Sequence, residues 1–388
     1  MYKIRRCSRL FKRQVGGNLM EILDGISTME NYLCDMASME WRPIAATFEL
    51  LPACNMDCKM CYVRMSMKEM NERGRMMNAD EWIEMGQKAV DEGVLFMLLT
   101  GGEPLLHPQF KEIYEGLRRL GLIVNINTNA TLIDEEMANF FAKNKPRRVN
   151  ISLYGASNET YKNLCNNPKG FTQVENAIKL LKARNIHIKL NFCITPYNIM
   201  DMDKMIEFAE KYEIPVAPTS YMYPPNRKEK LGDYNAHRLT PYEAAKARFD
   251  LDIKEKGDEF GAFAKTTLDD IKSRENLEPI CERGFGCRAG NSTFWINWQG
   301  EMTACGMLSG ETIDLKKHGM KQSWKMLNEK VSCTKRNDKC PTCKYKNICY
   351  VCVASCQAEA GAFEGVPQYL CDMNEEYEKL LIKHINYI

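Results

Sequence analysis

Three closely spaced cysteines have the type and spacing that most strongly indicate chemistry. Cys54, Cys58 and Cys61 stand close together, and the aromatic Tyr62 follows directly. Thiolates at this spacing can converge from one loop onto a single iron–sulfur cluster, yet three ligands leave one of its four irons without a protein donor. An incomplete ligand set keeps a position open for a substrate or cofactor. The spacing therefore predicts a reactive cluster, with half of a zinc site and chance clustering as the alternatives.

A second, larger group of cysteines occupies the C-terminal part of the chain. Ten of the 17 cysteines fall between residues 281 and 371, and four others are scattered. We therefore predict two separate metal-binding regions and interpret the scattered cysteines as small buried apolar residues. The C-terminal group comprises Cys281, Cys287, Cys305, Cys333, Cys340, Cys343, Cys349, Cys352, Cys356 and Cys371, and the scattered cysteines are Cys7, Cys34, Cys165 and Cys193.

The composition limits the classes of partner. A chain of 388 residues with 45% hydrophobic content can form two domains, or one large domain with an appendage. Lysine plus arginine (53) nearly balances aspartate plus glutamate (51), so no overall charge draws the protein to nucleic acid or to an anionic membrane. The sequence has neither a secretory signal nor an apolar run of about 18 residues, which disfavours a disulfide scaffold and a membrane span. We therefore expect reduced, metal-binding cysteines in the cytoplasm.

Repeated βα units between residues 44 and 225 are expected to position the first cysteine group. Short apolar runs of β type alternate there with amphipathic helical stretches, which is typical of a parallel sheet. The first strand, residues 44–51, leads directly into the segment that carries the three cysteines, here called the cysteine loop (residues 52–65). The other five expected strands span residues 95–100, 123–127, 148–153, 187–194 and 215–221, and the expected helices span residues 78–91, 108–120, 134–143, 171–183 and 202–211.

Polar residues gather where these strands end. Parallel strands joined by right-handed helical crossovers place their carboxyl ends on one rim, which is where such folds build active sites. We therefore expect the cysteine loop and these polar residues to lie close together. They are Thr100 to Pro104 after the second strand, Asn127 to Asn129 after the third, Ser152 and Tyr154 with the fourth, and Lys189 and Asn191 within the fifth.

These motifs, in this order, resemble those of the radical S-adenosylmethionine (SAM) enzymes. The resemblance rests on the cysteine spacing, on Tyr62, and on the run Gly101-Gly102-Glu103-Pro104 after the next strand. It implies an α/β fold, a partial (β/α)6 TIM-like barrel of parallel strands, in which the three cysteines hold a SAM-binding 4Fe–4S cluster. In that family the open iron chelates the methionine part of SAM, and one electron cleaves SAM to a 5'-deoxyadenosyl radical that removes hydrogen from a substrate.

The resemblance also implies which residues bind SAM. Gly101 and Gly102 lack side chains, so that the backbone can approach a ligand closely. Glu103 offers a carboxylate to a bound ammonium group. Ser152 and Asn191 resemble the polar groups by which the family holds the ribose and carboxylate of SAM. The expected cofactor-binding residues are Tyr62, Gly101, Gly102, Glu103, Pro104, Asn129, Ser152 and Asn191.

The C-terminal cysteines resemble the SPASM extension of radical SAM enzymes that modify peptides and proteins. The matching residues, in chain order, are Cys287, Gly300, Cys305, Cys340, Cys343 and Cys349. This extension usually carries two auxiliary iron–sulfur clusters. The alternation in residues 293–298 predicts one strand of a small hairpin, which would present Cys287 and Cys305 together. The expected organisation is an N-terminal extension (1–43), the radical SAM partial barrel (44–225), a bridging region (226–280) and a cysteine-rich SPASM domain (281–388).

The resemblance implies ligand sets for two auxiliary 4Fe–4S clusters. By position, the first set is Cys281, Cys287, Cys305 and Cys356, and the second is Cys340, Cys343, Cys349 and Cys371. One departure affects the last ligands, because Val353 stands where the family has a cysteine. Cys349 and Cys352 therefore compete as candidates, and Cys333 has no expected role. A zinc-binding region is the alternative, since closely paired cysteines suit zinc.

The leading hypothesis is a radical SAM enzyme that modifies a ribosomally made peptide by forming a thioether or carbon–carbon crosslink. Many such relatives carry a leader-binding domain before the barrel, whereas the roughly 45 residues present here are fewer than an ordinary small domain has. We therefore expect either a separate leader-binding protein or a substrate that does not depend on a leader, and a reductant such as ferredoxin or flavodoxin. The catalytic base leaves no trace in the sequence.

Two alternatives remain. An anaerobic sulfatase-maturating enzyme oxidises a cysteine or serine to formylglycine and commonly has an aspartate after the cysteine that matches Cys305, which would remove a proton. Gly306 stands at that position here. The other alternative is an iron–sulfur electron carrier or binding protein without SAM cleavage, which the intact glycine motif disfavours.

Overall fold

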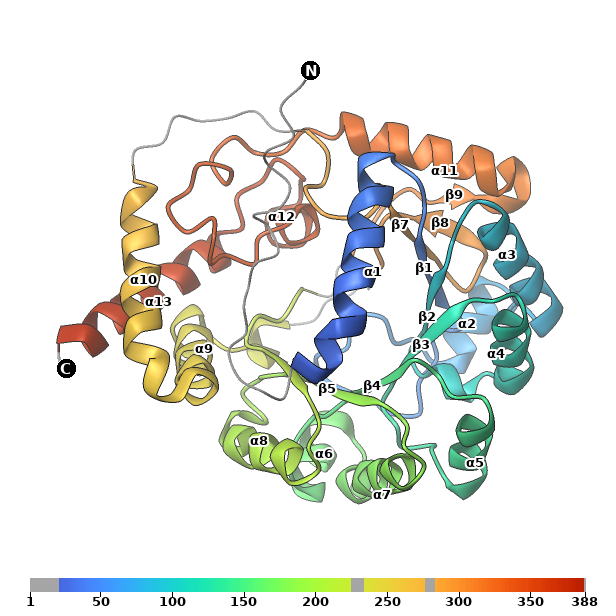
Figure 1. The fold of residues 1–388 in the computed structure, drawn as a ribbon, viewed down its shortest axis with the longest axis horizontal. Helices are drawn as coiled ribbons and strands as arrows, with labels where there is room; N and C mark the ends of the chain where they lie inside the picture. Colours follow the sequence, from blue (N-terminus) through green and yellow to red (C-terminus); the bar gives the residue numbers. More distant parts are fainter. Residues whose placement is uncertain (1–20, 225–233, 276–282, 387–388) are drawn as a thin grey trace.

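The computed structural model describes residues 21–224, 234–275 and 283–386 (Figure 1). Cys7 and Cys281 lie outside these residues. The described chain is organised around one nine-stranded sheet with the strand order β6-β5-β4-β3-β2-β1-β7-β8-β9. Figure 1 shows helices along the outer face of the curved parallel part of the sheet, while the last third of the chain lies beside it.

Six parallel strands form a partial barrel, as predicted. They are β1 (Ala45–Glu49), β2 (Phe96–Thr100), β3 (Ile123–Thr128), β4 (Arg148–Ser152), β5 (Ile188–Cys193) and β6 (Val216–Thr219). Each pairs in parallel with its neighbours in chain order. Alternate residues such as Val124 and Ile126 of β3 are fully buried beneath the helices. The carboxyl ends of the strands therefore share one rim.

Helices between the strands cover the outside of the barrel. They are α2 (Met67–Arg73), α3 (Ala79–Asp91), α4 (Phe110–Arg119), α5 (Glu135–Lys143), α6 (Asn158–Cys165), α7 (Gly170–Ala183) and α8 (Met202–Lys211). A capping box of Asn78 and Glu81 starts α3. Helix α4 buries Phe110, Ile113 and Leu117, whose spacing places them on one face of a helix. Helices α2 and α6 are not among the predicted elements.

Helix α1 (Glu21–Met39) packs against residues that precede two of the strands. Glu30 forms an ion pair with Arg147, which directly precedes β4. The hydroxyl groups of Ser38 and Ser292 lie 2.7 Å apart, and Ser292 directly precedes β7. Figure 1 shows α1 crossing the barrel. The described part of the N-terminal extension therefore lies at the end of the barrel opposite the rim.

The predicted hairpin is present and extends the barrel sheet. It comprises β7 (Thr293–Ile296) and β8 (Glu301–Thr303), and the short β9 (Ile313–Asp314) pairs with β8. Strand β7 runs parallel to β1 along its other edge. The indole N–H of Trp295 donates a hydrogen bond of 2.9 Å to the buried carboxylate of Glu49 at the end of β1. The sequence pattern predicted the hairpin but not its attachment to β1.

The C-terminal region adds a helical layer that holds the cysteine-rich loops. Its helices are α9 (Pro241–Lys256), α10 (Phe260–Ser273), α11 (Leu315–Cys333), α12 (Val353–Ala360) and α13 (Gln368–Asn386), with short 3-10 turns at Tyr234–His237 and Gly257–Glu259. Two further 3-10 turns, Pro104–Leu106 and Ile199–Asp201, belong to the barrel. Helices α9 and α10 both pack on α13. Arg248 of α9 donates a hydrogen bond to the carbonyl of Ile348, and Arg274, which directly follows α10, donates one to the carbonyl of Cys343.

None of the helices among the described residues is both long and apolar enough to cross a membrane.

Candidate active site

A cavity of about 360 Å³ lies at the carboxyl ends of the strands, and we call it the rim cavity. All three cysteines of the cysteine loop line it. Six of the eight expected cofactor-binding residues line it as well, namely Tyr62, Gly101, Gly102, Asn129, Ser152 and Asn191. The rim thus brings together residues that are far apart in sequence, as its parallel topology requires.

Backbone and amide N–H groups point at the sulfur atoms of the cysteine loop. Cys54 Sγ accepts from the backbone N–H of Met56 (3.4 Å) and from the side-chain amide of Asn129 (3.6 Å). Cys61 Sγ accepts from the backbone N–H of Arg64 at 3.3 Å. Such donors stabilise thiolates and orient them. Burial nevertheless raises the pKa of Cys54 to about 12, so the thiolate form requires a bound metal.

The donor set fits an iron–sulfur cluster better than a single metal ion. Among the described residues, no three histidine, cysteine, aspartate or glutamate side chains converge closely enough to hold one ion. A zinc ion needs its ligands around one point, whereas the thiolates of a cluster each bind a different iron. Cys54, Cys58 and Cys61 line one cavity without converging on a point. They are therefore the residues that would hold a 4Fe–4S cluster.

The two glycines of the Gly-Gly-Glu-Pro run allow its backbone to pack against the cysteine loop. A Cβ at Gly102 would lie 2.3 Å from the carbonyl oxygen of Ala53, and one at Gly101 would lie 2.4 Å from that of Leu51. The N–H of Gly102 donates to Leu51 and that of Glu103 donates to Ala53. The sequence predicts that the backbone at these glycines approaches a ligand closely. In the structure this backbone packs against the backbone of the preceding segment, and both glycines also line the rim cavity.

Glu103 does not line the rim cavity. Its carboxylate is fully buried and accepts hydrogen bonds from the N–H of Leu105 (3.0 Å), the hydroxyl of Thr128 (2.8 Å) and the N–H of Asn129 (2.7 Å). Asn129 in turn donates to Cys54. In the described structure Glu103 therefore braces the neighbouring strand end, and its predicted contact with a bound ammonium stays a prediction. Pro104 is also buried away from the cavity, at the start of a 3-10 turn.

Ser152 and Asn191 stand side by side at the ends of β4 and β5, where they form a register pair. Both face the rim cavity together with Tyr62 from the cysteine loop. Lys189, the other polar residue that the sequence places in β5, is not among the lining residues. The paired strands thus position two polar groups from separate βα units on one wall, where a polar ligand can reach both.

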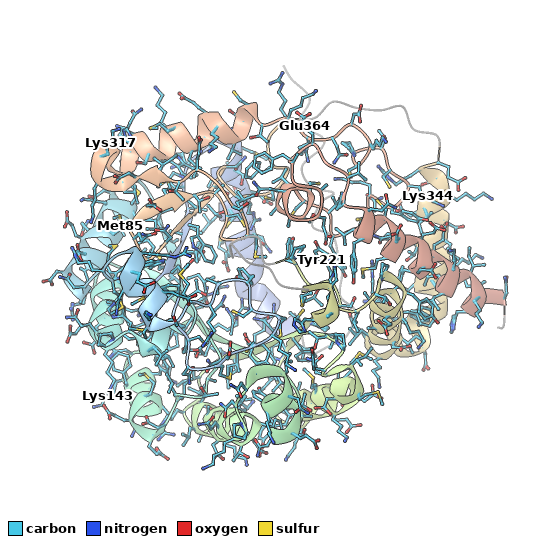
Figure 2. All side chains as sticks on the ribbon, turned by 180° about the vertical axis from the view of Figure 1, so that it is seen from behind. Met85, Lys143, Tyr221, Lys317, Lys344 and Glu364 are labelled. Carbon is cyan, nitrogen blue, oxygen red and sulfur yellow. The ribbon has the colours of Figure 1, made fainter. Side chains whose placement is uncertain are left out.

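Several residues of the rim cavity were not predicted. Tyr221 is the last residue of the sixth expected strand and Tyr223 lies two residues beyond it, so their position at the rim was a usable signal. Figure 2 shows Tyr221 near the middle of the molecule, whereas Lys143 and Lys344 lie at its periphery. Met307 enters from the loop after β8 and closes the cavity from the cysteine-rich side. No local pattern marks Met307, because its position depends on how the hairpin docks on β1.

The C-terminal cysteines form two overlapping neighbourhoods. Cys340, Cys343, Cys349 and Cys371, the predicted second set, line one small cavity. Cys287 lines a second cavity with Cys352 and Cys356, and Cys340 and Cys349 reach this cavity as well. Cys305 lies in the loop after β8, with its sulfur accepting from the N–H of Met307 at 3.5 Å. Cys333 is exposed at the end of α11 and lines neither cavity.

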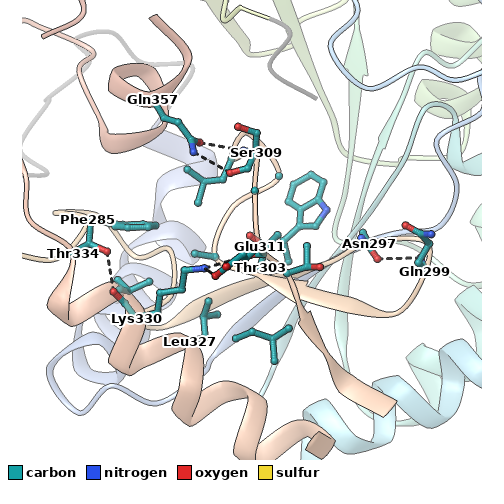
Figure 3. Close-up of a pocket in the computed structure, with 18 of the residues that line it drawn as sticks. Phe285, Asn297, Gln299, Thr303, Ser309, Glu311, Leu327, Lys330, Thr334 and Gln357 are labelled. Atoms are coloured by element: carbon teal, nitrogen blue, oxygen red, sulfur yellow. Dashed lines mark hydrogen bonds and ion pairs between the residues drawn. The ribbon is translucent and has the colours of Figure 1, made fainter. Parts of the chain in front are cut away.

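Another cavity, of about 610 Å³, lies between the hairpin, α11 and the loop after Cys305 (Figure 3). Lys330 of α11 pairs there with Glu311 at 3.3 Å. The side chain of Gln357 in α12 exchanges two hydrogen bonds with the backbone of Ser309. These two hydrogen bonds attach the loop after β8 to α12. The same loop carries Met307 into the rim cavity.

Residues 48–209 match the family model of the Radical SAM superfamily. The matched segment begins in β1, contains the cysteine loop and the glycine run, and ends in α8. This part of the chain is a radical SAM domain.

Curated relatives extend the similarity beyond the radical SAM domain. The AdoMet-dependent heme synthase of Methanosarcina barkeri is 24% identical over 346 residues, which cover 85% of this chain and 95% of that protein. The antilisterial bacteriocin subtilosin biosynthesis protein AlbA of Bacillus subtilis is 24% identical over 325 residues, which cover 80% of this chain and 67% of AlbA. Both matches are too long to be confined to the radical SAM domain.

Solved structures share the fold around the radical SAM domain and beyond it. Streptococcus suis SuiB bound to its precursor peptide SuiA has a TM-score of 0.61 at 17% identity, covering 85% of this chain and 76% of SuiB. The protein anSMEcpe with bound AdoMet has a TM-score of 0.65 at 20% identity, covering 89% of this chain and 100% of anSMEcpe. The predictions of a radical SAM enzyme, with a SPASM-type region after its partial barrel, are confirmed.

Proposed function

We propose that this radical SAM enzyme abstracts hydrogen from a ribosomally made peptide and so introduces a thioether or carbon–carbon crosslink. The observation that carries the proposal is the rim cavity, which is walled by the radical SAM domain and by Met307 from the cysteine-rich region. The similarity to AlbA and to peptide-bound SuiB spans both of these regions, and it supports a peptide as the substrate.

The cofactors of this proposal are SAM and three 4Fe–4S clusters. Cys54, Cys58 and Cys61 would hold the first cluster, and Ser152 and Asn191 would contact SAM. When bound, the first cluster supplies the electron that cleaves SAM to the hydrogen-abstracting radical. The C-terminal cysteines would hold the two auxiliary clusters.

The lining of the rim cavity favours a peptide side chain over a highly charged small molecule. Among the described residues that line it there is no lysine, arginine or histidine. Methionines and aromatic residues such as Met60, Tyr154 and Phe192 dominate instead. A tetrapyrrole with several carboxylates would call for basic partners. This lining is a reason to place the heme synthase activity of the Methanosarcina relative below peptide modification.

Sulfatase maturation is the second candidate, because anSMEcpe aligns along its whole length with this chain. The aspartate expected in that activity is replaced by Gly306. A Cβ at Gly306 would lie only 2.6 to 2.7 Å from atoms of the Trp295 ring. The indole that binds Glu49 thus occupies the space where an aspartate side chain would begin. This packing weighs against the formylglycine reaction, which needs a base near the substrate radical.

The third alternative, an electron carrier without SAM cleavage, is at odds with the site. A carrier has no need for an open iron or for a cavity beside it. Here the cysteine loop, Gly101 and Gly102 line a common cavity.

The reductant is proposed to be ferredoxin or flavodoxin, and a separate protein is proposed to bind the leader of the precursor peptide. The described part of the N-terminal extension supports the second proposal. Helix α1 packs on the barrel through Ser38, and also through Asp35, whose carboxylate accepts from Arg288 at 2.8 Å. The face of α1 that makes these contacts is therefore occupied by the protein itself and is not free to bind a leader peptide.

The test is anaerobic turnover of the reconstituted protein with SAM, dithionite and peptides encoded by short reading frames beside its gene. We expect 5'-deoxyadenosine, deuterium transfer into it from a labelled peptide, and a peptide product that has lost two hydrogen atoms per crosslink. Mass spectrometry measures all three. Formylglycine in a cysteine or serine peptide would instead support the second candidate, and 5'-deoxyadenosine that never acquires peptide deuterium would refute peptide modification.

A further inference from the structure

Tyr223 is one of the side chains at which the wall of the rim cavity meets the cysteine-rich region. Tyr223 follows β6 and lines the rim cavity. Its hydroxyl oxygen lies 3.2 Å from the sulfur of Cys352. Its ring packs edge-on against Tyr221, with the ring centroids 4.8 Å apart, which fixes the direction of the phenol. A residue of the radical SAM domain thus contacts a candidate ligand of an auxiliary cluster.

Cys352 lies in the neighbourhood of the first auxiliary set. Cys352 and Cys287 line one cavity. The thiols of Cys352, Cys305 and Cys287 are all near enough to the phenol of Tyr223 to interact with it electrostatically. A phenol carries its proton at neutral pH, so that of Tyr223 can donate a hydrogen bond to the sulfur of Cys352.

The backbone at Cys352 is fixed by the start of α12. The N–H of Cys352 donates to the hydroxyl of Ser355 at 2.9 Å, and that hydroxyl donates to the carbonyl of Cys352 at 2.8 Å. Cys352 is the residue before α12, so its side chain extends from a fixed corner at the positive end of the helix. Both features suit a thiolate ligand.

Cys356 has different surroundings. It lies one turn further along α12, is 3% exposed, and accepts a hydrogen bond of 3.7 Å from the side-chain amide of Asn337. The oxygen of that amide accepts from the N–H of Cys340 at 2.7 Å. Cys356 therefore sits between the two cysteine neighbourhoods, in contact with an asparagine that orients the loop of the second one.

We propose that Cys352, in place of Cys356, joins Cys287 and Cys305 in holding the first auxiliary cluster, and that Tyr223 donates a hydrogen bond to its thiolate. The proposal rests on the auxiliary clusters of the proposed function. Tyr223 is then a positioning residue that links the rim cavity to that cluster. Hydrogen bonds to cluster sulfurs favour the more negative, reduced state, so this bond raises the reduction potential.

The first experiment measures iron in a protein that retains only its auxiliary clusters. In the background C54A/C58A/C61A, two 4Fe–4S clusters correspond to about eight irons per chain. Adding C352A is expected to remove about four of them and one signal in the electron paramagnetic resonance spectrum of the reduced protein. Adding C356A, the matched control on the same helix, is expected to leave both. The reverse result, iron lost with C356A and kept with C352A, overturns the assignment.

The second experiment measures the reduction potential of the auxiliary clusters in the same background. Y223F is expected to lower the potential of one cluster without loss of iron. Y221F is the matched control, since its hydroxyl donates to Glu359 at 3.0 Å and to no thiolate, and it is expected to leave both potentials unchanged. An unchanged potential in Y223F overturns the proposal whatever the iron counts.

The two proposals fail separately. Protein that holds its auxiliary iron but forms no 5'-deoxyadenosine from SAM in the presence of a reductant refutes the proposed function and leaves the cysteine assignment standing. Fewer than about eight irons in the background protein refutes the auxiliary clusters themselves, and with them the role of Tyr223.

Discussion

At the scale of single residues, the thiols of the cysteine loop are held protonated until a metal displaces their protons. Burial raises the pKa of Cys54 to about 12, and the adjacent thiol of Cys165, together with burial, raises that of Cys58. Cluster assembly must therefore release protons, and the binding of metal to these residues becomes weaker as the pH falls.

Replacing Cys54, Cys58 and Cys61 together by alanine is expected to abolish reductive cleavage of SAM, because no other described cysteine set lines the rim cavity with this spacing. The measurement is 5'-deoxyadenosine formed by the anaerobically reconstituted protein with dithionite. C333A is the control, since Cys333 is exposed and lies outside both cysteine neighbourhoods. Cleavage that persists in the triple variant would disprove the ligand assignment.

Glu103 is expected to make stability depend on pH. Burial raises its pKa from the ordinary 4.5 to about 7, against the effect of its three hydrogen-bond donors. The folded state then holds the proton more tightly than the unfolded state, so the stabilisation is complete below about pH 4.5 and is lost as the pH rises through about 7.

We therefore expect the difference in unfolding free energy between wild type and E103Q to fall between about pH 5 and about pH 8. Urea unfolding at a series of pH values measures it. E72Q on α2, which removes an exposed carboxylate, controls for the change in net charge. A difference that stays flat over this range would show that Glu103 does not titrate in it.

Local spacing was sufficient to predict that the three cysteines and the two glycines lie at the site, because the cysteines share one loop and the glycines share one turn. The lining roles of Ser152 and Asn191 followed from strand position. The contact of Tyr223 with Cys352 and the position of Met307 in the rim cavity could not be predicted. Both depend on how the cysteine-rich region docks against the rim.

At the scale of elements, the turn after β2 is fitted against the cysteine loop. G102A is expected to destabilise the protein by about 1 to 3 kcal/mol through overpacking, because the new Cβ meets two backbone carbonyls of the loop. It should also reduce the iron bound at the first cluster, which iron analysis measures.

G121A is the matched control for this change. Gly121 has a φ of +86° but open space around its Cβ position, so alanine there introduces strain of roughly 1 to 2 kcal/mol without a clash. It is expected to lower the midpoint of thermal unfolding and to leave the iron content unchanged. Iron loss of equal size in both variants would point to general destabilisation.

The elements of the barrel could be predicted because alternation and helical periodicity are strong there. Helices α1, α2, α6 and α10 to α13 were not predicted. Helices α2 and α6 are each an additional helix within one βα crossover. Helix α11 packs on β8 and β9, whereas α10 and α12 pack on α13. Their hydrophobic patterns carry less information than that of a helix with one solvent face, such as α4.

At the scale of the whole molecule, a buried ion pair joins α12 to the segment after the barrel. The side chains of Arg238 and Glu359 are only 8% and 5% exposed, and they meet at 2.7 Å. Glu359 also accepts from Tyr221 of the rim cavity, and the Arg238 guanidinium stacks 3.9 Å above the ring of Tyr369.

R238M is expected to destabilise the protein by about 3 to 5 kcal/mol, because it leaves a buried carboxylate without its cation. Denaturant unfolding measures the change. R119M is the control, since Arg119 and Glu115 form an exposed pair at 3.9 Å that is worth about 0 to 1 kcal/mol. Equal losses in the two variants would mean that the buried pair does not hold the regions together.

The attachment of β7 to β1 has a mechanical consequence. Strand β1 is hydrogen-bonded along both edges, by β2 and by β7, and it leads straight into the cysteine loop. Loosening the hairpin would free one edge of the strand that anchors the first three thiols. A change that loosens the hairpin is therefore transmitted along β1 to the cysteine loop.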